Sequence, residues 1–231
     1  MKRATPRIVR SRERHEEQVE PLWPPFVSML AVGGLYTALP PSRLGGAPRW
    51  LPVTIVAMLA VPIFILHHRH NHFLGQVLGY ILNSLVTVAL IVSLGFLIEQ
   101  VTEHHVTPAQ LLRSAAALWV SNFLVFASWY WRLDGGGPHK RAKTVGHTDG
   151  AFLFPQMTMH PEAKSAAGEE EWEPNFIDYL FLAFNTSTAF SPTDTAFLSQ
   201  RAKVLMMVQA ILSLLILAVL VSRAVNTLVA A

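Results

Sequence analysis

The sequence contains no cysteine, and this absence excludes several kinds of chemistry at once. Without thiols the chain has no disulfide framework, no thiolate metal site and no cysteine nucleophile. The sequence also lacks a nucleophile–base pair, a nucleotide-binding loop and zinc-protease spacing. We therefore expect a protein that is not an enzyme and that carries no cofactor.

Charged residues are scarce as well. Only 14% of the 231 residues are Asp, Glu, Lys or Arg, whereas 52% are hydrophobic. A soluble protein of this size needs more charge to cover its surface. The apolar residues fall in long blocks, and blocks of about 18 or more residues are typical of membrane-spanning helices. We predict an all-α, polytopic transmembrane helix bundle with five to six apolar helices, one of them re-entrant or pore-type.

The order of the apolar and polar segments predicts four regions. The apolar segments are residues 23–39, 50–66, 73–101, 109–133, 175–190 and 199–228. The regions are a basic cytoplasmic tail (1–21), a four-helix transmembrane region (22–133), a polar loop with an apolar island (134–174), and a final region (175–231) with a short helix, a Ser-Pro-Thr-Asp hinge and the last transmembrane helix.

Individual residues mark the ends of the fourth apolar segment. Thr107 and Pro108 form an N-cap and N1 pair at its start. Its other end carries Trp129, Tyr130 and Trp131, followed by Arg132, which indicates an interfacial aromatic belt with a basic anchor. The glycine run after Asp134 then stops the helix.

The N-terminal tail concentrates positive charge in six residues: Lys2, Arg3, Arg7, Arg10, Arg12 and Arg14. By the positive-inside rule the N-terminus is cytoplasmic, where such a tail lies near anionic lipid. Because no aromatic residue interleaves these charges, we do not expect nucleic-acid binding. If residues 175–194 cross the membrane, both termini are inside. If they re-enter, the C-terminus is outside, and Arg201 with Lys203 favours this second arrangement.

The final region resembles the pore loop and inner helix of potassium-channel-like proteins. Aromatic residues of a short helix precede two threonines, a hinge and an aspartate: Tyr179, Phe181, Phe184, Thr186, Thr188 and Asp194. Ser191, Pro192 and Thr193 replace the Gly-Tyr-Gly of the filter. Those glycines let successive carbonyls point at the ion, so potassium selectivity is not expected here.

The resemblance implies an oligomeric cation channel with a non-standard filter, built from Thr186, Ser187, Thr188, Ser191, Pro192, Thr193 and Asp194. Gln209 and Ser213, at i, i+4 spacing on the last helix, would line the path, with a monovalent cation as the ligand. The alternative, which we slightly favour, is a non-conducting scaffold or accessory protein. The threonine and serine hydroxyls would then bond to helix carbonyls, the hinge would be a turn, and Asn83, Ser84, Ser121, Asn122, Gln209 and Ser213 would bond between helices.

The C-terminal half also resembles a family of uncharacterised bacterial inner-membrane proteins. The motifs that carry this resemblance are residues 131–138 (WRLDGGGP), 152–156 (FLFPQ), 176–180 (FIDYL) and 191–194 (SPTD). The resemblance implies a multi-pass protein of the bacterial inner membrane, with no established activity. The membrane interior offers no mid-span Asp, Glu, Lys or Arg, which proton-coupled transporters and voltage sensors usually need.

A third hypothesis concerns the four histidines of one short turn: His67, His68, His70 and His72. Imidazoles this close together can hold zinc, copper or nickel. However, the turn has no carboxylate, and Arg69 among the histidines would repel a cation. We favour a polar interfacial turn over a metal-handling site.

Overall fold

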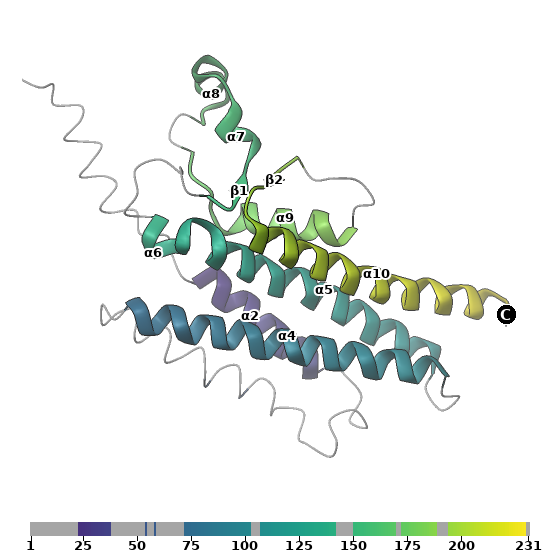
Figure 1. Ribbon diagram of the computed structural model, residues 1–231. Coiled ribbons are helices and arrows are strands. Elements are labelled where there is room, and N and C mark those ends of the chain that lie inside the picture. The colour runs from purple at the N-terminus through teal and green to yellow at the C-terminus, as the bar shows by residue number, and fades with distance from the viewer. Residues whose placement is uncertain are drawn as a thin grey trace, which may run out of the picture.

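The computed structural model describes residues 23–37, 54, 58, 72–102, 107–141, 150–169, 172–188 and 194–229, which are mostly helical. The long helices are α2 (Trp23–Thr37), α4 (His72–Thr102), α5 (Pro108–Leu133) and α10 (Gln200–Val229), with the shorter α9 (Phe176–Thr188) beside them. α5 contacts all four of the others and lies between the α2–α4 pair and the α9–α10 pair (Figure 1). The ends of these helices lie within two residues of the predicted segments.

Three of these helices are long and apolar enough to cross a membrane, over Leu74–Gln100, Ala109–Gly136 and Gln200–Ser222. This makes the chain compatible with a membrane protein. α2 has a shorter apolar stretch, Pro24–Leu35. The predicted segment 50–66 lies outside the described residues, except for positions 54 and 58 in helix. The count of five to six helices therefore stays a prediction.

The start and the end of α5 follow from local chemistry. Thr107 is the N-cap, and its side chain accepts a hydrogen bond from the Gln110 backbone N–H in a capping box, with Pro108 in the first turn, as predicted. At the other end, the three glycines after Asp134 have φ values of 57°, 78° and 96°. Side chains with a Cβ rarely adopt such values, so glycine is needed to turn the chain sharply out of the helix.

The aromatic residues at the end of α5 are not an exposed belt, and this prediction was wrong. Tyr130 and Trp131 are fully buried, and Arg132 is 8% exposed. Successive helix positions are about 100° apart, so each ring meets a different neighbour. Trp129 donates to Thr87 of α4, Tyr130 to Gln209 of α10, and Trp131 packs against α9.

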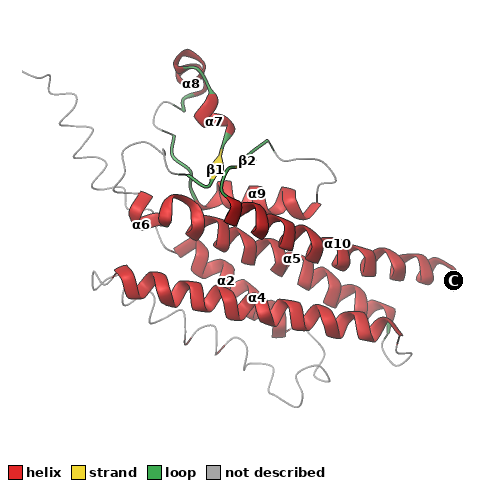
Figure 2. Cartoon of the chain, viewed as in Figure 1, coloured by secondary structure: helices red, strands yellow, loops and turns green. Residues whose placement is uncertain are grey.

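A small cap of short elements closes this end of the bundle. Beyond η2 (Asp134–Gly136) and α6 (Pro138–Arg141), it comprises β1 (Phe152–Leu153), α7 (Pro155–Thr158), α8 (Pro161–Ala167) and β2 (Ala196–Phe197). β1 and β2 pair antiparallel, with Phe152 opposite Phe197. α7 and α8 project away from the long helices (Figure 2).

The apolar island of the polar loop packs onto the bundle. Phe152 is 1% exposed and Phe154 is 3% exposed. The Phe152 ring makes edge contacts with Tyr130 of α5, Tyr179 of α9 and Phe197 of β2, at centroid distances of 5.2, 6.1 and 5.3 Å. Edge-to-face aromatic pairs at these distances stabilise a core beyond simple burial. The cap is therefore joined to α5 and α9 through aromatic side chains.

Candidate functional site

The last turn of α9 carries three hydroxyl side chains that the sequence singles out, and two of them bond within the helix. Thr186 Oγ1 donates to the Leu182 carbonyl at 2.8 Å, and Thr188 Oγ1 donates to the Phe184 carbonyl at 3.1 Å. Hydroxyls commonly bond to a carbonyl one turn earlier when they sit inside a helix. The hydroxyl groups of these two threonines therefore find hydrogen-bond acceptors within α9 itself.

Ser187, between them, faces α10. Gln209 Nε2 donates to Ser187 Oγ at 2.8 Å and to the Ala183 carbonyl at 2.6 Å. Ser213 Oγ donates to the Ser187 carbonyl at 2.6 Å. Gln209 is fully buried and Ser213 is 2% exposed. The i, i+4 pair of α10 therefore bonds to two carbonyl groups in the C-terminal half of α9, of which the Ser187 carbonyl is one that the helix itself leaves free.

α5 supplies the third side of this arrangement. Tyr130 OH donates to Gln209 Oε1 at 2.5 Å, and Asn122 Nδ2 lies 3.4 Å from both Ser187 Oγ and the Gln209 carbonyl. We call Asn122, Tyr130, Ser187, Gln209 and Ser213 the polar junction. All five are neutral and buried. In the described part of the chain, Asn122 Oδ1 is the junction atom left without a hydrogen-bond partner.

The interhelical bonding expected of the neutral polar residues is confirmed for four of the six. Asn83 accepts from Ser128 Oγ of α5 at 3.2 Å, and Asn122, Gln209 and Ser213 bond across helices in the junction. Ser84 and Ser121 instead donate to carbonyls of their own helices. The pore-lining role of Gln209 and Ser213 stays a prediction.

The other predicted site residues lie elsewhere. Asp194 is exposed and lies just before β2, away from the polar junction. Residues 191–193 of the hinge lie outside the described residues, as do His67, His68 and His70. His72 is the first residue of α4. Among the described residues there is no group of three or more His, Cys, Asp or Glu that could hold a metal ion.

Asp134 is a buried site residue that the sequence presented only as a helix stop. Its carboxylate is fully buried, and it accepts hydrogen bonds from Tyr179 OH at 2.6 Å and from the Ala151 backbone N–H at 2.5 Å. Arg141 lies over the Tyr179 ring, 5.2 Å from its centroid, and donates to the Asp134 carbonyl. Asp134 therefore ties α9 and the cap to the end of α5. In the sequence, the signal for this buried role was the place of the aspartate between an aromatic triplet and a glycine run.

The two ends of the segment from α9 to β2 lie on the same side of the bundle. Phe176 packs on Trp131 at the end of α5, whereas Ser187 lies beside Trp119 and Asn122, farther back along that helix. Phe197 then returns to Tyr130, and the Leu198 N–H donates to the Ala151 carbonyl at 2.8 Å. The chain thus runs inward along α5 in α9 and is back at the cap in β2.

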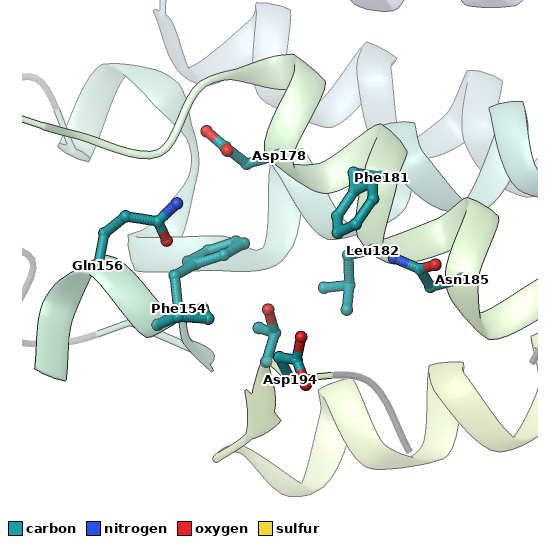
Figure 3. A pocket seen from close by; sticks show the side chains of 9 residues that line it. Phe154, Gln156, Asp178, Phe181, Leu182, Asn185 and Asp194 are labelled. Carbon is teal, nitrogen blue, oxygen red and sulfur yellow. The ribbon is translucent and has the colours of Figure 1, made fainter. Parts of the chain in front are cut away.

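A small open pocket of about 80 Å³ lies between α7, α9 and the segment before β2. Figure 3 shows Asp178 and Asp194 at two edges of the pocket, with Phe154 and Leu182 between them. Burial raises the pKa of Asp178, and the charge of Glu169 acts in the same direction, while a hydrogen bond from Asn175 opposes the rise. The complete lining is Phe154, Pro155, Gln156, Asp178, Phe181, Leu182, Asn185, Asp194 and Thr195.

The chain matches no protein-family model, no curated protein and no solved structure. The chemistry of the polar junction, of Asp134 with its partners and of the pocket is therefore the basis for a function.

Proposed function

We propose that this chain is an integral membrane protein in which α9 re-enters the bilayer, and that it acts as a non-conducting scaffold or accessory protein. Re-entry is supported by length. At a rise of about 1.5 Å per residue, the 13 residues of α9 extend about 20 Å, which is less than a hydrocarbon core of about 30 Å. The return of β2 to the cap side agrees with the same topology.

The observation that carries the non-conducting function is the polar junction. An ion path needs polar groups that face water. Here the groups of α9 and α10 that could do so bond to one another and to α5, and Gln209 is fully buried. Irregular or polar structure at membrane depth is tolerated when it is buried in protein, and the junction meets that condition.

Charge on the cap side supports an orientation. The described basic residues at this end include Lys140, Arg141, Lys164, Arg201 and Lys203, whereas Arg113 is at the other end of α5. By the positive-inside rule we place the cap in the cytoplasm. With α9 re-entrant, the C-terminus is then outside. In a bacterium, this arrangement corresponds to a multi-pass inner-membrane protein.

Cation flux into liposomes tests the scaffold function. We expect vesicles with the purified protein to take up potassium or sodium no faster than protein-free vesicles, because the junction is dry. A known channel, reconstituted in parallel, shows that the assay detects flux. Cation uptake that is faster in the protein-containing vesicles than in the protein-free vesicles would contradict the scaffold function.

An oligomeric cation channel is the second candidate, and one observation favours it. Asp194 is exposed at the cap side of α10, where a carboxylate would attract cations to a mouth. One hairpin cannot enclose a pore, so this function requires a homo-oligomer. It predicts protein-dependent flux that Asp194→Asn lowers and Glu162→Gln, on the exposed α8, leaves unchanged. A monomer in nanodiscs would contradict it.

A further inference from the structure

We propose that the pocket between α7, α9 and the segment before β2 binds an ammonium group on a short organic stem, carried by a free amine or by an ethanolamine lipid headgroup. The site rests on the pocket itself and not on the scaffold function. Its cavity volume of about 80 Å³ suits a group of a few heavy atoms.

The polar lining of the pocket calls for a ligand that donates hydrogen bonds. Asp194 and Asp178 bring two carboxylates, which only accept when ionised. Gln156 and Asn185 add amide groups to the lining. An ammonium brings three donors and the positive charge that the carboxylates require.

The apolar lining distinguishes an organic cation from a metal ion. Phe154, Phe181 and Leu182 form much of the wall, and Figure 3 places the Phe154 and Leu182 side chains between the two carboxylates. Aromatic faces attract ammonium groups, and apolar side chains cover a methylene stem. Calcium and magnesium instead require six or more oxygen ligands, many of them water. The lining therefore favours a stemmed ammonium.

The two carboxylates have different parts in this site. Asp178 Oδ2 accepts the Asn175 backbone N–H at 2.8 Å, which caps the start of α9, so Asp178 contributes mainly through its charge. Asp194 is exposed, and no hydrogen bond to another described residue fixes it. Asp194 is thus the side chain placed to contact the ammonium directly, and the Asn185 amide belongs to the same lining.

Calorimetry on the full chain in detergent tests the site, with ethanolamine as the probe and magnesium chloride in parallel. We expect saturable ethanolamine binding that Asp194→Asn weakens by roughly two- to fivefold, the upper part of the range for an exposed charge contact. Phe181→Leu, which keeps an apolar wall but removes the aromatic face, should weaken it as well. Glu162→Gln, a carboxylate on α8 outside the pocket, is the matched control and should bind like the parent.

Three results would overturn the site: no saturable ethanolamine binding, equal binding in all variants, or magnesium binding that Asp194→Asn abolishes while ethanolamine does not bind. Nanodiscs distinguish the two sources of the ammonium. If ethanolamine binds in phosphatidylglycerol discs but not in phosphatidylethanolamine discs, the lipid headgroup occupies the pocket. If it binds equally in both, the ligand is a free amine. Neither result depends on the flux assay.

Discussion

Gln209 is the residue on which three helices converge. Its side chain bonds to Ala183 and Ser187 of α9 and to Tyr130 of α5, and none of it reaches solvent. Bonds of this kind in membrane proteins contribute about 0.6 kcal/mol each on average, but removing one partner leaves the others unpaired. The consequences of substitution therefore exceed the value of any single bond.

We predict that Gln209→Leu lowers the free energy of unfolding by about 1–3 kcal/mol, because it keeps the side-chain size but removes the hydrogen bonds to Tyr130 OH, Ser187 Oγ and the Ala183 carbonyl. Thermal unfolding in detergent measures the change. Gln200→Leu replaces an exposed glutamine of the same helix and should be nearly neutral. Equal stability of the two variants would show that the junction does not hold the helices.

Asp178 gives the chain a pH-dependent contribution to stability. Its pKa is raised from the ordinary 3.8, chiefly by burial, so the folded state favours the protonated form. The stability this contributes is complete below pH 3.8 and is lost as the pH rises through the raised pKa of the folded state. At neutral pH the chain with an ionised Asp178 is therefore less stable to unfolding than a chain with a neutral side chain at this position.

We predict that Asp178→Asn raises the unfolding temperature at about pH 7 and that this difference disappears at about pH 3, where the aspartate is neutral in both states. Asparagine can still accept the hydrogen bond that caps α9. Glu162→Gln, on an exposed face of α8, is the control variant and should unfold like the parent chain at neutral pH. A constant difference at every pH would contradict the effect of burial.

At the scale of elements, α9 is positioned by its first and last turns. Tyr179 in the first half donates to the buried Asp134, and Ser187 at the end belongs to the polar junction. The exposed side of α9 is apolar, with Ile177 and Phe181 each 64% exposed. The helix is therefore attached along one face and open along the other.

We predict that Tyr179→Phe costs about 1.5–3 kcal/mol, the range for a hydrogen bond to a charged group, and that it loosens α9 and the cap. Hydrogen exchange followed by mass spectrometry should show faster exchange in residues 150–188. Tyr80→Phe removes a neutral bond to the Arg132 carbonyl and is the comparison variant. It should leave exchange in α9 unchanged, and faster exchange in both variants would contradict a specific anchor.

The sequence predicted the ends of these helices well, because apolar runs, Thr107, Pro108 and the glycine turn act locally. The partners of α9 were harder to predict, because they come from residues far away in the chain. Asp134 and Tyr179 are separated by 45 positions, and Tyr130 and Gln209 by 79. The two-residue strands are too short to show a periodicity of two. The row of aromatics in α5 predicted an interfacial belt, whereas neighbouring helices bury it.

For the whole molecule, the number of crossings decides where the C-terminus lies. The chain has no cysteine, so single cysteines can report the side of each segment without background. With α9 re-entrant, the cap and the end of α10 lie on opposite sides. If α9 crosses, they lie on the same side.

We predict that Asn226→Cys reacts with an impermeant maleimide in intact bacterial cells, whereas Glu162→Cys reacts only after the cells are permeabilised. The parent chain should not react in either case, because it has no thiol. If both positions required permeabilisation, α9 would be a full crossing. If both positions reacted in intact cells, α9 would again be a full crossing, and the cytoplasmic placement of the cap would also be wrong.

The burial of Asp134 sets an order on how the chain is assembled during synthesis. Tyr80 of α4 precedes α5 in the chain, so its bond to the end of α5 can form as soon as the α4–α5 pair is inserted. Asp134 gains its hydrogen bond from Tyr179 only after Tyr179 has left the ribosome, and the bond of Tyr130 to Gln209 forms later still. The end of α5 therefore stays incomplete until nearly the whole chain has been translated, and in a chain truncated before α9 the Asp134 carboxylate would lack the hydrogen bond from Tyr179.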